Sequence, residues 1–398
     1  MGHHLIRKEA TGVSGGMAKI SIISLIISLS AAFVSTIWAL YVDSFVGDVS
    51  KVGYLTAFLA FVSFFSYFYF VPLMQKADKG KLFIFSLVLL GAVYLLFSYI
   101  KSFYLFLILA VIFTIALALR VMTFGIIVKD ASKKGELSKN EGLKYTFANI
   151  AFVIGPLIAG YLLNVIGINY LFVISAVVIL IGALFFWGFG IHDGKKSRHV
   201  NKSMIKNFFS FFKSRERIIS YILGGGVYFW WGLIYLFIPL YIVREGLSKS
   251  YVGYFLFAVA VPLIFLEYWF AKIAGRRGFK KMFVFGYSIA GTFAIACFFV
   301  SNIYVMIGLL TLASLGLAML EPTVESYFFD ILNEDEEYRY YGPFNTSVDL
   351  NAFVGRVLGS TILLFLPFKF IFLLFGGAMF IFALIALNVR DVVESTKK

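Results

Sequence analysis

The chain has 398 residues, of which 61% are hydrophobic and only 14% are charged, and its formal net charge is +14. A soluble domain of this length could not cover so much apolar surface, so the composition excludes an ordinary water-soluble protein and predicts that most of the chain faces lipid. The basic charge alone would suit nucleic-acid binding, but its distribution along the chain argues against that partner.

Twelve apolar segments follow one another along the chain, each near the length of about 20 residues that a membrane-spanning helix needs. They lie near residues 19–42, 51–72, 82–100, 103–130, 144–166, 168–191, 217–243, 250–271, 282–300, 303–331, 343–366 and 368–389. The sequence therefore predicts an all-α polytopic membrane protein with twelve transmembrane helices.

Lysines and arginines are distributed unequally between the loops on the two sides of the expected membrane. The alternate loops that include 76–81, 129–144 and 195–217 contain most of the 35 basic residues. The loops on the opposite side contain few, namely Lys51, Lys101, Arg244, Lys249 and Lys369. Because basic loops stay on the cytoplasmic side, we expect both termini in the cytoplasm and the protein in the cell (plasma) membrane. The basic charge then reports topology, and no nucleic-acid partner is expected.

The sequence repeats itself at an offset of 200 residues. The segment Val52-Gly53-Tyr54 recurs as Val252-Gly253-Tyr254. Because each unit holds six expected spans, the two halves are parallel repeats, and such halves bind a substrate at the seam between them. We expect an N-terminal six-helix half over 1–191 and a C-terminal six-helix half over 217–398.

The polar stretch 192–216 separates the two halves. Its aromatic residues, among them Phe208 and Phe211, alternate with lysines such as Lys206. This mixture favours a helix at the cytoplasmic headgroup layer, with aromatics towards the lipid. The alternative is a disordered basic linker.

One expected cytoplasmic loop and one expected span carry motifs that indicate a family. The loop between spans two and three reads Asp-Lys-Gly-Lys over 78–81, and span five reads Gly-Pro-Leu-Ile-Ala-Gly over 155–160. These resemble two signatures of the major facilitator superfamily, the loop of the G-x-L-A-D-R-x-G-R-K type and the G-P-x-x-G-G element associated with antiporters. The chain departs from them by lysines in place of arginines and by Ala159 in place of a glycine. Together with the twelve spans, the chain resembles drug/proton antiporter-like members of this superfamily.

The resemblance implies a latch at Asp78, because the aspartate of this motif contacts the start of span eleven in the family. Here that region lies at 342–345. Aligned amides at a helix N-terminus favour a carboxylate by about 0.3–1 kcal/mol. The remaining latch residues would be Lys79, Gly80, Lys81 and Asp130. The alternative is a solvated loop acid beside lysines that set the topology.

The motif in span five has two interpretations. Gly155 and Gly160 allow close helix approach, and Pro156 removes an intrahelical hydrogen bond and permits a bend. The resemblance implies an antiporter-like helix bend. Simple tight packing explains the same residues equally well.

Ionised side chains inside a membrane are costly and indicate function, because each costs a few kcal/mol unless it is paired or hydrated. Six such residues lie within the expected spans: Arg120, Glu267, Glu321, Glu325, Asp349 and Arg356. Glu321 and Glu325 are four residues apart and share a helical face, as do Asp349 and Arg356 at a spacing of seven.

Arg120 and Glu321 are expected to lie at a similar depth, about 15 Å from the cytoplasmic ends of their helices at about 1.5 Å per residue. Spans four and ten face each other in the superfamily, so the resemblance implies an Arg120–Glu321 pair across the seam, with Arg356 as the competing partner. We predict that Glu321, or Glu325, exchanges protons, because burial favours a neutral carboxyl and a nearby arginine favours an ionised one. A permanent structural salt bridge is the alternative.

Aromatic residues gather in span seven, whose counterpart lines the cavity in the family. They are Tyr228, Trp230, Trp231 and Tyr235. Aromatic faces beside carboxylates suit lipophilic cations, although interhelical packing explains them equally well. The glycines at 224–226 are either a hinge or a close helix contact.

The sequence thus predicts a secondary transporter that moves a small solute by alternating access, with proton-coupled efflux of amphipathic or cationic compounds as the favoured function. The alternative is proton-linked uptake or facilitated diffusion of a metabolite, in which Arg120 binds an anionic group. A polytopic lipid-modifying enzyme is disfavoured, because no His, Cys or Ser cluster converges at one depth. The expected partners are a small-molecule substrate, protons and the lipid bilayer. No cofactor or metal is expected, and the protein is expected to be a monomer.

Overall fold

The computed structural model describes residues 15–131, 137–190, 204–332 and 334–390, and within these ranges it contains helices and no strands. The elements are α1 (Gly15–Val46), α2 (Val49–Lys76), α3 (Lys79–Phe97), α4 (Phe103–Ala131), α5 (Leu137–Val165), α6 (Gly167–Gly188), α7 (Met204–Phe211), α8 (Arg215–Gly232), the π-helical turn η1 (Leu233–Phe237), α9 (Ile238–Arg244), α10 (Ser250–Arg277), α11 (Phe279–Phe298), α12 (Ile303–Asp330), α13 (Glu334–Phe365) and α14 (Phe370–Ala386).

These helices confirm the predicted fold class. Among the described residues, eleven helical segments are long and apolar enough to cross a membrane, and α8, η1 and α9 together form one of them, Arg215–Arg244. The shorter apolar helix α14 occupies the position of the predicted twelfth span. Many large apolar side chains on the outside of the bundle are exposed, including Leu184 and Phe265. Such a surface requires a lipid covering.

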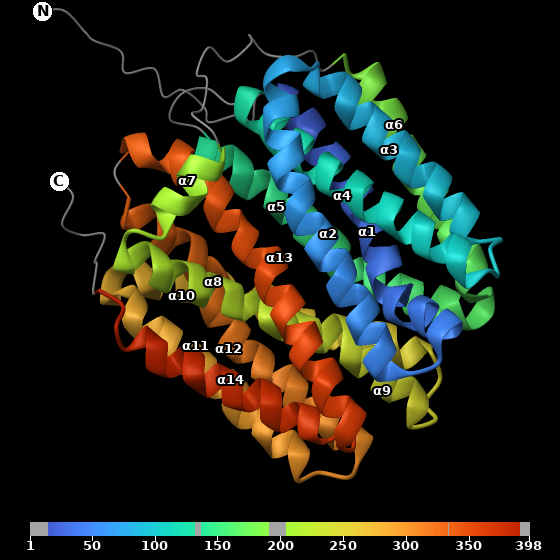
Figure 1. Cartoon of the computed structure of the whole chain (residues 1–398), viewed down its shortest axis with the longest axis vertical. Helices are drawn as coiled ribbons and strands as arrows, with labels where there is room; N and C mark the ends of the chain where they lie inside the picture. The colour runs from blue at the N-terminus through green and yellow to red at the C-terminus, as the bar shows by residue number, and fades with distance from the viewer. Residues whose placement is uncertain (1–14, 132–136, 191–203, 333, 391–398) are drawn as a thin grey trace, which may run out of the picture.

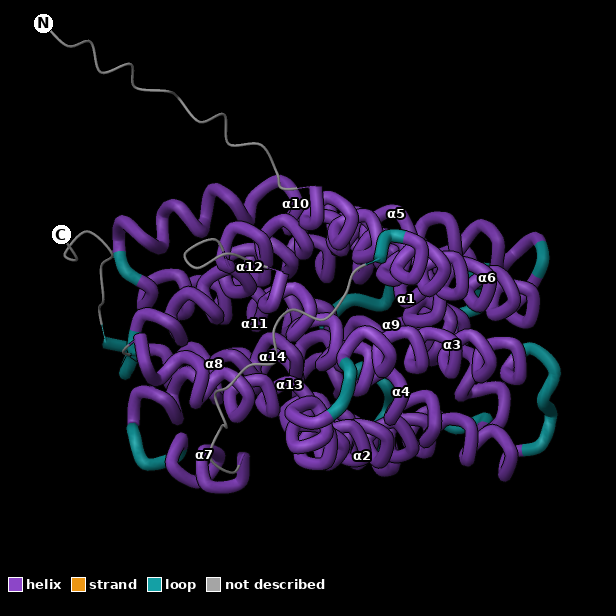
Figure 2. Tube along the Cα trace, turned by 90° about the horizontal axis from the view of Figure 1, so that it is seen from above, coloured by secondary structure: helices purple, strands orange, loops and turns teal. Residues whose placement is uncertain are grey.

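The helices lie in two groups that meet along two seams (Figure 1). Helices α1 to α6 pack mainly with one another, and α8 to α14 do the same. One seam is formed by α2 and α13, and the other by α5 and α10. The view from above places these two seams on opposite sides of the bundle (Figure 2). The two groups are therefore joined on two opposite sides of the bundle.

The α2–α13 seam contains polar contacts along its length. The hydroxyl of Tyr54 lies 2.8 Å from the hydroxyl of Thr361, and Arg356 Nη1 donates to the Thr56 carbonyl oxygen at 2.8 Å. At one end of the bundle, the last residue of α9 meets the last turn of α1 and the chain that follows it. There, Arg244 Nη2 lies 3.0 Å from Asp43 Oδ1. We call this end, defined by Asp43 and Arg244, the distal end.

Near the distal end, α5 and α10 approach each other so closely that only glycine fits. A Cβ atom on Gly160 would lie 2.8 Å from the Gly253 Cα atom, and one on Gly253 would lie 2.6 Å from the Gly160 Cα atom. Small residues let helix backbones come this close in a membrane. Gly253 belongs to the internal repeat, as the counterpart of Gly53, and Gly53 faces Ser360 and Phe237 in the other group. The repeated glycines therefore mark both seams.

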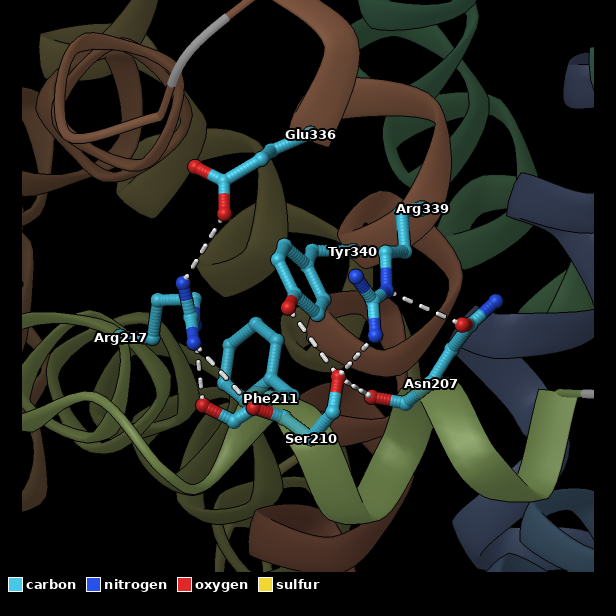
Figure 3. Close-up of polar contacts among 7 residues, drawn as sticks. All are labelled: Asn207, Ser210, Phe211, Arg217, Glu336, Arg339 and Tyr340. Atoms are coloured by element: carbon cyan, nitrogen blue, oxygen red, sulfur yellow. Dashed lines mark hydrogen bonds and ion pairs between the residues drawn. The ribbon is translucent and has the colours of Figure 1, made fainter.

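Helix α7 lies in the predicted linker and is fastened to the second group by polar contacts (Figure 3). Ser210 Oγ donates to the Tyr340 hydroxyl at 3.0 Å. Arg339 donates to Asn207 Oδ1 at 3.2 Å and to Ser210 Oγ at 3.0 Å. Arg217 donates to the carbonyl oxygens of Ser210 and Phe211, at 3.2 and 3.0 Å.

The aromatic residues of α7 do not form the lipid-facing row that the sequence predicts. Phe211 is fully buried, and Phe208 packs on Phe64 and Phe68 of α2 with ring centroids 6.2 and 5.6 Å apart. Phe209 is 69% exposed. The reason is that α7 finds aromatic partners within the protein, so its aromatic side chains contribute to tertiary packing. Helix α7 thus touches both groups of helices.

We expect Arg217→Gln to release α7 from the second group. The Arg217 guanidinium bonds to the last carbonyls of α7, lies 3.5 Å from Glu336 and stacks 4.2 Å above the Tyr340 ring. Charged hydrogen bonds of this kind contribute about 1.5–3 kcal/mol, so the α7 amides should exchange with deuterium roughly 10- to 100-fold faster. Arg215→Gln is the control, because the polar contact of Arg215 among the described residues is with exposed Asn388 and not with α7. Equal exchange of α7 in both variants would contradict this role of Arg217.

Candidate functional site

Glu321 of α12 is held inside the bundle by side chains from two other helices. Trp231 of α8 donates its indole N–H to Glu321 Oε1 at 2.7 Å. The carboxyl of Glu267, from α10, lies within electrostatic range of Glu321. Two ionised carboxylates repel each other, so neighbouring carboxyl groups are costly inside a membrane unless one of them is neutral or paired. The site thus brings two carboxyl groups and an indole N–H together from three helices.

The backbone around Trp231 departs from regular α-helix. The π-helical turn η1 begins two residues later, at Leu233. Single π turns inside helices occur frequently at functional sites. The Trp231 and Tyr235 rings lie 5.3 Å apart, and Tyr235 is within electrostatic range of Glu321. Both predicted aromatics thus contact or face the same carboxyl group.

Tyr228 and Trp230, the other two predicted cavity aromatics, have different environments. Tyr228 is 38% exposed, although it lies in the interior part of α8, and both Glu321 and Glu325 act on it electrostatically. Trp230 is fully buried, and its indole nitrogen makes no hydrogen bond within the described residues. Tyr228 is therefore accessible beside the carboxyl groups, whereas Trp230 is a packing residue.

Arg120 of α4 does not form the predicted pair with Glu321. Its electrostatic partners are Tyr94 of α3 and Tyr67 of α2, and its Nη1 atom is buried without a hydrogen-bond partner among the described residues. The physical reason is that Trp231 and Glu267 already occupy the Glu321 carboxyl. Arg120 and Glu321 belong to opposite groups of helices, and the prediction of a direct contact is wrong for this conformation.

Asp349 and Arg356, both on α13, contact α2 at the α2–α13 seam. Asp349 lies close enough to Ser63 of α2 and to Arg356 to interact with both electrostatically. Arg356 donates to the Thr56 carbonyl of α2. Arg356 is therefore not the partner of Glu321 either. These two charges connect the two groups of helices.

The glycines at 224–226 and those of α5 are sites of close contact. A Cβ atom on Gly225 would collide with the Asn351 side chain, and one on Gly224 would lie 3.1 Å from Phe344 and from Val324. On α5, a Cβ atom on Gly155 would lie 2.5 Å from the Ala32 Cβ atom. These contacts support the packing interpretation of both motifs.

Pro156 lies within the continuous helix α5, and its carbonyl faces Gly253 of α10. Gly160, one turn further along α5, also contacts Gly253. The motif of span five is thus located at the α5–α10 seam, between the two groups of helices. Its association with antiport stays a prediction.

Asp78 does not reach α13 in this conformation. It is the N-cap of α3, and its Oδ1 atom accepts from the Lys81 backbone N–H at 3.0 Å. Lys79 and Asp130 form a short ion pair, 2.6 Å from Nζ to Oδ2, so part of the predicted charge cluster is present. Gly80 is buried at the first turn of α3. The predicted contact between Asp78 and 342–345 is not formed here.

Sequence reasoning missed two participants in the site, Glu267 and Tyr67. Glu267 is recognisable as an intramembrane charge, but nothing in the sequence pairs it with Glu321. Tyr67 is one aromatic among many in a span rich in phenylalanine and tyrosine. In the structure Tyr67 lies within electrostatic range of Arg120, Asp349 and Tyr228.

A bundle of long apolar helices with carboxyl groups in its interior defines an integral membrane protein with a polar central site. The family comparison is specific. The family model described as Major Facilitator Superfamily matches residues 20–277 and 227–398, and the chain belongs to this family of membrane transporters.

Two curated relatives are similar in sequence. The staphylopine export protein of Staphylococcus aureus is 26% identical over 260 residues, covering 62% of this chain and 64% of the exporter. The chain thus matches somewhat less than two thirds of that protein. An uncharacterised MFS-type transporter of Methanocaldococcus jannaschii is 21% identical over 337 residues, covering 83% of this chain and 86% of the relative.

Solved transporter structures share the fold. A POT family transporter in complex with a thioalcohol-conjugated peptide superimposes with a TM-score of 0.79 at 11% identity, over 94% of this chain and 95% of the other. A POT family transporter in complex with 5-aminolevulinic acid gives 0.78 at 12%, over 94% and 96%. The nucleoside transporter NupG gives 0.74 at 12%, over 94% and 98%. These likenesses confirm the major facilitator fold.

Proposed function

We propose that this protein is a proton-coupled secondary transporter that exports a small amphipathic or cationic solute. The observation that carries the proposal is the carboxyl pair of Glu321 and Glu267, with Trp231 bonded to Glu321. A buried carboxyl pair can take up and release a proton without leaving the bundle, as a proton carrier must. The similarity to an exporter supports the outward direction.

The coupling follows from competition for the carboxyl pair. When a cationic solute group approaches Glu321, its charge stabilises the ionised form of both acids and the shared proton leaves. When the solute leaves, a proton returns. Glu325 lies four residues along the same helix and acts on Tyr228 together with Glu321, so it is the second candidate for the proton.

Alternating access would be a rocking motion of the two groups of helices. The contacts of the distal end, at Asp43–Arg244 and Gly160–Gly253, hold that end together in this conformation. In the opposite conformation they would separate, and the groups would close at the other end. We propose that the N-terminal half (1–191) and the C-terminal half (217–398) move as units in this way, as a monomer in the cell membrane with both termini cytoplasmic.

A second candidate function is proton-linked uptake or facilitated diffusion of an anionic metabolite. It is favoured by Arg120, whose buried Nη1 atom has no hydrogen-bond partner within the part of the chain that is described. A guanidinium in this state is a ready ligand for a carboxylate. In this case the carboxyl pair would still carry the proton, but solute and proton would move in the same direction.

Reconstitution into proteoliposomes tests the proposal. Solute flux is measured with and without an imposed pH gradient over a panel of dyes, amino acids and sugars. Export coupled to protons predicts that an inward proton gradient accelerates efflux of at least one solute. Acceleration of uptake by the same gradient would establish the second candidate, and flux indifferent to pH would contradict proton coupling in either form.

Asp78→Asn is expected to lower the transport rate without destabilising α3. Asparagine caps a helix about as well as aspartate, whereas alanine at this position would cost roughly 1 kcal/mol. Asp78 contacts the start of α3 here, so we propose that its charge acts when the helix ends opposite the distal end approach each other and it meets α13. The measurement compares thermal unfolding and transport for Asp78→Asn. Unchanged transport in this variant would show that Asp78 acts only as the N-cap of α3 and that its charge has no role in transport.

A further inference from the structure

The two groups of helices place opposite charges in the interior of the bundle. We call the side of Arg120 the positive wall, and the side of Glu321, Glu267 and Glu325 the negative wall. On the first group of helices, Arg120 is the charged side chain in the interior part of α4, and its nearest titratable neighbours are tyrosines. On the second group, Glu321, Glu267 and Glu325 lie on α12 and α10. Asp349 and Arg356 accompany each other at the seam and largely cancel. The two groups thus face each other with opposite charge.

Two tyrosines connect the walls. Tyr67 lies within electrostatic range of Arg120 on one side and of Tyr228 on the other. Tyr228 in turn lies within range of Glu321 and Glu325 and is 38% exposed. Tyr67 of α2 and Tyr228 of α8 thus neighbour each other and the charges of both groups of helices. Hydroxyl groups between two opposite charges suit a polar solute that extends between them.

We infer that the substrate is a zwitterion, with its anionic group bound at Arg120 and its cationic group bound at Glu321 and Glu325. This inference rests on the proposed transport function and names the solute class. The buried Arg120 Nη1 atom, which has no hydrogen-bond partner among the described residues, is the position for a carboxylate. The carboxyl groups beside Tyr228, together with the Trp231 and Tyr235 rings, are the position for an ammonium group.

The charges on the two walls disfavour solutes with a single charge. A lipophilic cation would be attracted to Glu321 and repelled by Arg120, and a simple anion would meet the reverse. A zwitterion satisfies both walls. It also supplies the bridge between Arg120 and Glu321 that the protein does not make by itself, so its binding favours approach of the two groups of helices. Solute recognition and rocking would then be one event.

Binding measured without any gradient tests this inference separately from transport. Purified full-length protein in nanodiscs is titrated with three matched sets of probes, and the unfolding midpoint reports binding. Each set holds a zwitterion, a cation and an anion on one skeleton: 5-aminolevulinic acid, its methyl ester and levulinic acid; phenylalanine, its amide and its N-acetyl form; dialanine, its amide and its N-acetyl form. In at least one set the zwitterion should bind about tenfold more tightly than both relatives.

Substitutions at Arg120 and Glu321 test which charged group of the solute each residue binds. In Arg120→Gln the zwitterion should lose its advantage over the cationic probe, whereas Arg120→Lys should keep it. In Glu321→Gln the zwitterion should lose its advantage over the anionic probe. Glu245→Gln, an exposed acid near the end of α9, serves as the control and should bind like the wild type. A change of preference between probes is a readout that mere loss of folding would not produce.

The inference is overturned if no zwitterion in the three sets binds more tightly than its singly charged relatives. It is also overturned if Arg120→Gln weakens zwitterion and cation equally while the unliganded protein unfolds like the wild type. Preferential binding of the cationic probes would overturn the inference but would agree with the export of lipophilic cations. Zwitterion binding without pH-driven flux would support the inference and would contradict only the proton coupling.

Discussion

Glu321→Gln is expected to abolish accumulation of solute against its gradient, whereas exchange between equal concentrations should continue at saturating solute, because binding is weakened but not lost. One proton moved per solute across a difference of about one pH unit supports a concentration ratio of about tenfold, because about 1.4 kcal/mol corresponds to a factor of ten. Glutamine cannot bind or release this proton. The ratio reached by the variant should therefore fall to about one under the same gradient.

The substitution is conservative towards the fold, which makes the expected loss informative. A glutamine amide oxygen can still accept from the Trp231 indole, and its amide nitrogen can donate to Glu267, so both contacts of Glu321 have a replacement. Glu216→Gln is the matched control, because Glu216 forms an exposed ion pair with Arg390 at 3.6 Å, away from Glu321. Accumulation by Glu321→Gln at the wild-type level would refute the role of Glu321 in coupling.

Gly253→Ala is expected to shift the protein away from the conformation in which the distal end is closed. The added Cβ atom would lie 2.6 Å from the Gly160 Cα atom and would also press on the Pro156 carbonyl. Both obstacles are backbone atoms, so the helices must move apart. Overpacking of this kind costs about 1–3 kcal/mol, which corresponds to a change of roughly 5- to 150-fold in the conformational equilibrium. Transport should slow, because the closed distal end becomes rare.

Cross-linking at the distal end measures this shift. Cysteines replace Asp43 and Arg244, whose side chains are 3.0 Å apart, in a background without the single native Cys297. Gly308→Ala is the control, because a Cβ atom on Gly308 of α12 meets nothing within 4 Å. The cross-linking yield should fall in Gly253→Ala and stay at the wild-type level in Gly308→Ala. Equal yields in the two glycine variants would show that the α5–α10 contact does not control closure.

The helices and the seams were predictable from the sequence because both depend on local patterns. Length and hydropathy define the spans without tertiary information. The repeat of Gly53 and Gly253 marks positions where helix backbones meet, since glycine allows this approach wherever it occurs. These are also the positions at which the structure brings the two groups of helices together.

The partners of the interior charges were not predictable, because depth along a helix does not determine the direction of a side chain. Arg120 and Glu321 are expected at similar depths, yet Glu321 is turned towards Glu267 and Trp231, on its own group of helices. The rotation of α12 about its axis depends on how it packs against α8 and α10. The π-helical turn after Trp231 also has no sequence signal that we recognise.

Linker helix α7 illustrates the same limit. Its aromatic and basic composition is typical of a membrane-surface helix. However, Phe208 and Phe211 find partners within the protein, and Arg217 bonds to the end of the helix. Composition alone does not distinguish lipid from aromatic protein surface as the neighbour of a phenylalanine.

The most direct measurement is proton movement driven by solute in vesicles that contain the purified protein. A solute jump is applied without a pH gradient, and a pH-sensitive dye inside the vesicles records the response. Coupled transport predicts a change of internal pH that requires the solute, reverses sign when the solute gradient is reversed and disappears in Glu321→Gln. Solute flux of normal rate without any movement of protons would contradict the proposed mechanism.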